Sequence, residues 1–291
     1  MMRCLKCGAQ IKAIDERVDC HLCGYSNMLP DLERLEVVIN SNLAGVSDRG
    51  LRHHRNQDYL DLNHVDHLNT QILVVCDGVS SSEQPELAAK TAAESACQFL
   101  TQISSETNPE VAIKSAFDIA LSSICDIPIQ VSEDVDPPST TIVAALVKNG
   151  IATIGWLGDS RAYWIDYSHR CKQLTRDDSW FMEVVAAGKM TEIEAQKSPH
   201  AHVITRWLSA DNIVDTVPSI INFKIPGAGY LLLCTDGLWN YTPEPQNLAN
   251  LLHQISGKDA ITISRALVEF ARSCGGHDNI TVGILTFPPL K

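Results

Sequence analysis

The sequence is short of positive charge. Its 291 residues carry 23 Lys and Arg against 35 Asp and Glu, which gives a formal net charge of −12. A protein that binds nucleic acid without sequence preference needs a basic surface, so this balance argues against nucleic acid as a partner. Two interpretations of the carboxylates stay open: some of them gather to hold cations, or they form an ordinary acidic surface.

Long apolar runs and glycine-rich phosphate loops are also missing. No window approaches the roughly 20 apolar residues that span a bilayer, and the first residues, MMRCLKCGAQ, lack the apolar region of a secretory signal. Neither G-x-x-x-x-G-K-[ST] nor G-x-G-x-x-G occurs, which argues against P-loop and dinucleotide-binding proteins. We expect a cytoplasmic protein with no membrane partner.

Cysteine is concentrated at one end of the chain. Four of the ten cysteines form two Cys-x-x-Cys pairs, each followed by Gly, with twelve residues between the pairs: Cys4, Cys7, Cys20 and Cys23. This spacing is typical of a structural zinc site with four thiolate ligands, and a fragment this short needs the metal in order to fold. A redox Cys-x-x-Cys pair is the alternative. We predict a zinc ribbon at residues 1–32 and one further domain at residues 33–291.

The second domain alternates between strand-like and helix-like segments. Apolar runs such as TQILVVCD and YLLLCTD predict strands, and Asn149-Gly150 predicts a type I′ hairpin turn. Asn108 followed by Pro109 predicts the start of a helix. Hairpins combined with helices that arrive in pairs, and few β-α-β crossovers, indicate an α+β sandwich and not a doubly wound sheet.

Five aspartates stand where predicted strands end or begin, beside small or polar residues: Asp58, Asp77, Asp159, Asp236 and Asp278. A single Asp-Gly pair is most simply a turn. Five such positions in one chain could instead project into a common cleft. Carboxylate oxygens without accompanying histidines suit Mg²⁺ or Mn²⁺ and argue against catalytic zinc.

In chain order, the segments RHHRNQD, VVCDGV, LGDSR, CTDGLWN and GHDNITV resemble the metal-dependent Ser/Thr protein phosphatases of the type 2C, or PPM, family, bacterial members above all. The resemblance extends from about Val38 to Thr286. It implies a four-layer αββα sandwich of two antiparallel sheets flanked by helices. It also implies hydrolysis of phosphoserine and phosphothreonine in protein substrates by water activated between two Mn²⁺ or Mg²⁺ ions.

The resemblance further assigns metal ligands. The expected set is Asp77 bridging both ions, Gly78 through its carbonyl, Asp236 and Asp278 on the second ion, Asp58 through metal-bound water, and Asp159 at a third, weaker metal site. A glycine after Asp77 would let the backbone oxygen approach a cation. Asn240 stands where some members carry another third-site Asp, which leaves occupancy of the third site open.

This chain departs from the family around the phosphate. The Arg that grips phosphate in the family commonly lies five residues before the first motif's Asp, and here that position is His53. Arg52 and Arg55 flank it, and we prefer Arg52 slightly. Val79 replaces a His proposed as the general acid of many members, so His53 is a candidate for that role, although a solvated turn histidine is the simpler interpretation. Arg161 is more simply structural than catalytic.

The segment from Asp178 to Leu208 resembles the flap beside the family's active site. We expect its aromatic residues, Trp180, Phe181 and Trp207, to be core anchors, with substrate contacts as the alternative. The zinc ribbon would bind a protein partner or dock on the phosphatase domain. The main alternative to an enzyme is a catalytically weak or inactive module that binds phosphoproteins. Nucleic-acid binding by the ribbon ranks low, because acidic residues offset its few basic ones.

Overall fold

The structure is a computed structural model that describes residues 33–128, 136–168, 170–211, 216–255 and 259–288. Four short strands are also described within the first 32 residues: β1 (Met2–Arg3), β2 (Gln10–Ile11), β3 (Arg17–Asp19) and β4 (Ser26–Met28). β1 pairs with β2, and β3 pairs with β4, both antiparallel. The predicted zinc ligands Cys4, Cys7, Cys20 and Cys23 lie outside the described residues, so the zinc ribbon stays a prediction.

Two antiparallel sheets form the centre of the molecule. The five-stranded sheet has the order β15-β11-β10-β8-β7. Its strands are β7 (Asp58–Val65), β8 (Thr70–Asp77), β10 (Ile142–Lys148), β11 (Ile151–Leu157) and β15 (Ser219–Lys224). A 3-10 helix at Asp66–Leu68 links β7 to β8.

The six-stranded sheet has the order β13-β12-β16-β17-β6-β5. Its strands are β5 (Arg34–Asn40), β6 (Leu43–Asp48), β12 (Arg161–Asp166), β13 (Cys171–Gln173), β16 (Gly229–Cys234) and β17 (Ile280–Phe287). A short pair, β9 (Ser139–Thr140) with β14 (Leu208–Ser209), lies outside both sheets.

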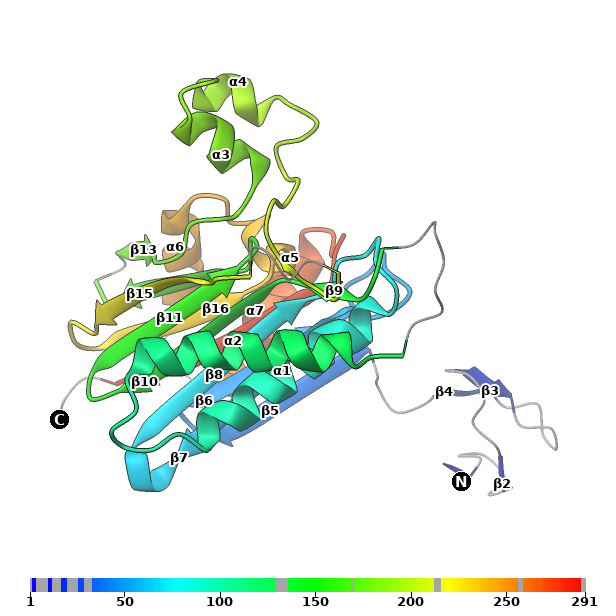
Figure 1. Ribbon diagram of the computed structural model, residues 1–291, viewed down its shortest axis with the longest axis horizontal. Helices are drawn as coiled ribbons and strands as arrows, with labels where there is room; N and C mark the ends of the chain where they lie inside the picture. Colours follow the sequence, from blue (N-terminus) through cyan, green and yellow to red (C-terminus); the bar gives the residue numbers. More distant parts are fainter. Residues whose placement is uncertain are drawn as a thin grey trace.

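Helices cover the outer faces of the sheets (Figure 1). Helices α1 (Pro85–Thr101) and α2 (Pro109–Cys125) pack on the five-stranded sheet. Helices α6 (Pro245–Ile255) and α7 (Ala260–Ser273) pack on the six-stranded sheet. A third hydrophobic core lies between the two sheets. The prediction of an α+β sandwich of two antiparallel sheets flanked by helices is confirmed.

Strand β8 explains why its sequence is an unbroken apolar run. Ile72 and Val74 pack in the core under α1 and α2, whereas Leu73 and Val75 pack in the core between the sheets. Successive side chains of a strand point to opposite faces, so a strand covered on both sides needs apolar residues at every position. The strand therefore holds its last residue, Asp77, rigidly.

Local signals in the sequence also match the structure. The Asn108 side chain accepts hydrogen bonds from the N–H groups of Glu110 and Val111 and so caps α2. Asn149 and Gly150 both have positive φ, at 52° and 73°, as a type I′ turn requires. Within the described residues, no helix combines the length and apolar character that a bilayer crossing needs.

The flap, residues 178–208, stands away from the sandwich at the top of Figure 1. It contains two short helices, α3 (Trp180–Ala186) and α4 (Glu192–Gln196). Gly188, between them, has a φ of 65°, which favours glycine. A further short helix, α5 (Asp236–Trp239), follows β16 directly.

Candidate metal centre

The five predicted aspartates lie at one end of the sandwich. Asp58 begins β7 and Asp77 ends β8, and the two residues are directly opposite each other in the antiparallel register. The others are placed by the neighbouring strands: Asp159 in the turn from β11 to β12, Asp236 just after β16, and Asp278 just before β17. Because adjacent strands are antiparallel, each of these starts and ends falls at the same edge.

Burial and mutual repulsion perturb this cluster strongly. Burial raises the pKa of Asp77 well above its usual range, and the charges of the other four aspartates raise it further. Burial likewise raises the pKa of Asp236 well above its usual range, with Asp278 adding to the effect. The pKa of Asp58 is raised to about 7, again mainly by burial and then by the charge of Asp278. The carboxylates are therefore close enough to interact.

Few positively charged groups offset the negative charges of the aspartate cluster. Asp278 has a basic neighbour in His53, whose Nε2 lies 3.3 Å from Asp278 Oδ1. In the described part of the chain, no ion pair involves the other four aspartates. One buried oxygen each of Asp58 and Asp236, the Oδ1 atom, has no hydrogen-bond partner among the described residues. Buried carboxylate oxygens are costly without a partner, and a cation would satisfy them.

The donor set fits hard divalent cations, because it consists of oxygen atoms from several strands. Across the described ranges, no three acidic, histidine or cysteine side chains already surround one point closely enough to hold an ion.

Gly78 is required by backbone packing. A Cβ atom at this position would lie 2.4 Å from the carbonyl oxygen of Pro85 and 2.7 Å from that of Gln57. The Gly78 N–H donates to the same Gln57 oxygen at 3.0 Å. Any side chain would push the start of α1 or the loop before β7 away from Asp77. This packing reason was not visible in the sequence, where the glycine was attributed to a cation's approach.

Comparison with known proteins decides the family. A sequence model described as "Protein phosphatase 2C" matches residues 49–270, about three quarters of the chain. The chain belongs to the protein phosphatase 2C family. The match includes four of the five aspartates, and Asp278 follows shortly after its end.

Curated relatives agree with this membership. The serine/threonine phosphatase stp of Listeria monocytogenes is 29% identical over 245 residues, which cover 81% of this chain and 92% of the relative. Protein phosphatase PhpP of Streptococcus pneumoniae is 25% identical over 243 residues, which cover 83% of this chain and 95% of the relative.

Solved structures share the fold. The serine/threonine phosphatase PstP of Mycobacterium tuberculosis has a TM-score of 0.71 at 23% identity and covers 84% of this chain. That alignment includes 98% of the solved chain. Stp1 of Staphylococcus aureus has a TM-score of 0.72 at 24% identity, over 88% of this chain and 95% of the other.

In this protein phosphatase 2C domain, the loop before β7 carries the candidate phosphate-binding residues. Asn279 holds the loop in place, because its Oδ1 accepts from the Gln57 N–H and its Nδ2 donates to two loop carbonyls. Arg55 is paired with Glu86 of α1 at 2.8 Å. Arg52 is exposed. Arg55 is exposed as well, so the two arginines differ in the ion pair with Glu86 and not in burial.

The side chain of Arg161 is engaged in contacts within the protein and is not available to bind a phosphate. Its guanidinium forms two hydrogen bonds to Asp177, at 2.9 and 2.6 Å, and a third to the Tyr163 hydroxyl at 3.1 Å. It also stacks on the Trp239 ring, 3.6 Å from the ring centroid. Trp239 donates in turn to the carbonyl oxygen of Asp159 at 3.0 Å. Arg161 thus connects Asp177, which directly precedes the flap, to Trp239, which is bonded to Asp159 of the cluster.

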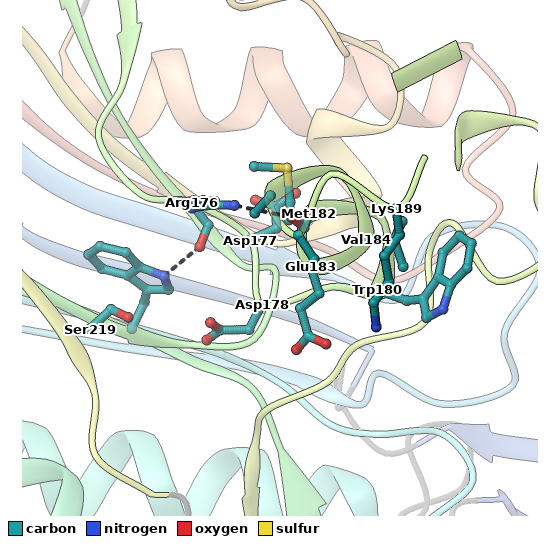
Figure 2. Close-up of a pocket in the computed structure, with 12 residues that line it drawn as sticks. Arg176, Asp177, Asp178, Trp180, Met182, Glu183, Val184, Lys189 and Ser219 are labelled. Atoms are coloured by element: carbon teal, nitrogen blue, oxygen red, sulfur yellow. Dashed lines mark hydrogen bonds between the residues drawn. The ribbon is translucent and has the colours of Figure 1, made fainter. Parts of the chain in front are cut away.

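Two cavities border the flap. One of about 230 Å³ touches Asp159 and Phe181. The other, of about 770 Å³, lies beside α3, and none of the five metal-centre aspartates lines it (Figure 2). Trp180 lines that cavity, and neither Trp180 nor Phe181 is fully buried. Because α3 buries none of its side chains, these two aromatics lie beside cavities and not in a buried core. The alternative, that they contact substrate, stays a prediction.

Proposed function

We propose that this chain hydrolyses phosphoserine and phosphothreonine in proteins with divalent ions held by the aspartate cluster. Protein Ser/Thr phosphatase function follows from the family model and from relatives that carry this name, and the alternative of an inactive phosphoprotein-binding module is not favoured. The dependence on Mn²⁺ or Mg²⁺, the ligand set and the role of each residue are the parts that we add.

The single observation that carries the metal assignment is the pair of buried, unpartnered Oδ1 atoms on Asp58 and Asp236. They belong to a cluster in which burial and repulsion raise the pKa values of the carboxyl groups. A PstP catalytic domain has been solved in complex with two manganese ions, which supports two ions for this fold. Two divalent ions would activate a water molecule as nucleophile and offset the charge of the phosphoryl oxygens.

The aspartates would have different roles in holding the ions. Asp77, held by β8, would lie between the two ions, with the Gly78 carbonyl beside it. Asp236 and Asp278 would hold one ion from the six-stranded sheet, and Asp58 would orient water from the other sheet. Asp159, whose pKa burial and the nearby Asp177 raise to about 7, would serve a third ion.

Substrate would approach over the loop before β7. Arg52 would bind the phosphate, because Arg55, although likewise open to solvent, is engaged by Glu86. His53, beside Asp278, would place a proton donor near the leaving alkoxide.

The test is an Asp236→Asn variant beside a matched Asp61→Asn control. Asp61 is also a partly buried aspartate, on the same sheet as Asp58, but its carboxylate accepts from the Leu62 N–H. We expect Asp236→Asn to lose a bound Mn²⁺ ion and roughly a thousandfold in kcat, since a bound ion contributes several kcal/mol. Asp61→Asn should keep both. Full activity of Asp236→Asn on a phosphopeptide would refute the assignment.

We also propose that the four cysteines bind one structural zinc ion. The support is their order in the sequence: Cys4 and Cys7 fall between the residues of the paired strands β1 and β2, and Cys20 and Cys23 fall between those of β3 and β4. Two Cys-x-x-Cys pairs with this spacing are typical of a structural zinc site. A Cys4→Ser variant should lose zinc and keep most Mn²⁺-dependent turnover. The ribbon would then serve a protein partner or dock on the phosphatase domain.

A further inference from the structure

Two buried threonines hold one oxygen of Asp58. Thr235 directly follows β16, and Thr281 lies in β17. Both residues are fully buried. The Oγ1 atom of each donates to Asp58 Oδ2 at 2.8 Å. Asp58 belongs to the five-stranded sheet and both threonines belong to the six-stranded side, so these bonds cross the interface between the sheets.

The surrounding hydrogen bonds fix the direction of both hydroxyls. The Thr281 N–H donates to Thr235 Oγ1 at 3.0 Å, which leaves the Thr235 proton for Asp58. Thr281 Oγ1 also lies 2.7 Å from Ser47 Oγ, which accepts from the Asn56 amide. A hydroxyl has one proton, and a carboxylate that holds a metal ion is ionised and only accepts. Thr281 therefore donates to Asp58, and Ser47 donates to Thr281.

This arrangement makes the two oxygens of Asp58 unequal. Oδ2 accepts two hydrogen bonds, whereas Oδ1 is buried and accepts none from any residue that the structure describes. The carboxylate cannot rotate without breaking both threonine bonds. Asp58 also lies directly opposite Asp77 in the strand register, so its orientation is fixed relative to the proposed bridging ligand.

We infer that Thr235 and Thr281 are positioning residues that fix the Asp58 carboxylate so that it offers only Oδ1 to the metal centre. The inference rests on the proposed metal-dependent function. It explains two motif positions, the Thr of CTDG and the Thr of DNITV, that carry no metal ligand themselves. Hydrogen bonds behind a ligand orient it, and their loss typically costs about 10–100-fold in metal affinity or activity.

The experiment compares Thr→Val, which keeps the shape and removes the hydroxyl, with Thr→Ser, which keeps the hydroxyl. Each is made at Thr235 and at Thr281 in the full chain, and Mn²⁺ binding to the metal-free protein is measured by calorimetric titration. We expect the Val variants to bind Mn²⁺ about 10–100-fold more weakly and the Ser variants to stay within about threefold of the parent. Thr286→Val is the control, because its hydroxyl bonds to Asn42 at the other end of β17.

Each outcome has a defined meaning. Equal Mn²⁺ affinity in the Val variants and the parent would overturn the positioning role, and so would Ser variants as weak as the Val variants, since packing and not the hydroxyl would then matter. Circular dichroism in EDTA checks folding. The two threonines are replaced one at a time, so one folded Val variant decides the question even if the other does not fold. If the parent itself bound no Mn²⁺, the proposed function would fail along with this inference; a parent that binds while the Val variants bind equally well refutes only the inference.

Discussion

The aspartate cluster and the flap are neighbours, but different kinds of contact hold them. The cluster is fixed by hydrogen bonds between buried groups of both sheets, such as those from Thr235 and Thr281 to Asp58. The flap helices bury almost nothing: α3 has no buried residue, and α4 has only Ala195. Figure 1 shows the same contrast, with the flap outside the layers of the sandwich.

The contrast indicates that the sandwich and the flap have different roles, namely a rigid metal centre and an adjustable segment beside it. Chemistry on a phosphate needs ligands held to within a fraction of an ångström, which a rigid sandwich provides. A segment with few buried contacts can adjust with little change in the global stability. The flap can therefore vary its position beside the cluster while the five aspartates keep theirs.

The largest expected effect separates a carboxylate of the cluster from one of the flap. Asp77→Asn should reduce kcat for p-nitrophenyl phosphate roughly a thousandfold, because the proposed bridging ligand of both ions is lost. Glu183 of α3 lines the cavity of Figure 2, and Glu183→Gln should leave kcat within about twofold of the parent value. Steady-state kinetics with saturating Mn²⁺ measure both. Comparable losses of kcat in the two variants would contradict the different roles of the sandwich and the flap.

The next effect concerns the ion pair that joins the two regions. Arg161 and Asp177 are about one-tenth exposed, and removal of one partner of a buried pair typically costs about 3–5 kcal/mol. Arg161→Met should lower the free energy of unfolding in urea by about that amount. The double variant Arg161→Met/Asp177→Leu should recover much of it, because no unpaired charge remains. A single variant as stable as the parent would show that the pair does not anchor the flap.

A pH titration tests the strain within the cluster. The pKa of Asp58 is raised to about 7 by burial, so the folded metal-free protein holds a proton that the unfolded chain releases near pH 4. Stability of the metal-free protein should therefore fall as pH rises through 7 and increase toward pH 5, by an amount on the order of a few kcal/mol.

Bound Mn²⁺ should reduce or reverse that dependence, because ions favour the ionised carboxylates. Thermal unfolding from pH 5 to 8, in EDTA and in Mn²⁺, measures both curves. Parallel curves would mean that the ions bind away from Asp58.

Local patterns in the sequence predicted the strands, the hairpin turn and the aspartates, because they depend on neighbours in the chain. The alternation of β8 between two cores and the cap at Asn108 are of this kind. The contacts that orient the site could not be predicted in this way. Thr281 and Asp58 are 223 positions apart, and nothing in either segment specifies the other. The packing of Gly78 against Pro85 likewise depends on where α1 begins.

The smallest expected effect compares two helix caps. Thr191 caps α4 through the Glu194 N–H, and Asn108 caps α2 through two N–H groups. Replacing either residue with Ala should cost its own helix about 1 kcal/mol. Because α2 buries seven residues in a core, Asn108→Ala should lower the global free energy of unfolding by about that amount.

Helix α4 buries a single alanine, so its loss should stay local. Thr191→Ala should leave the urea midpoint nearly unchanged and speed amide hydrogen exchange in α4 roughly fivefold, which is the equivalent of 1 kcal/mol. A lower urea midpoint for Thr191→Ala would mean that the flap unfolds together with the sandwich. In that case, the two regions would form one cooperative unit, and the flap could not adjust to a substrate independently of the aspartates that act on it.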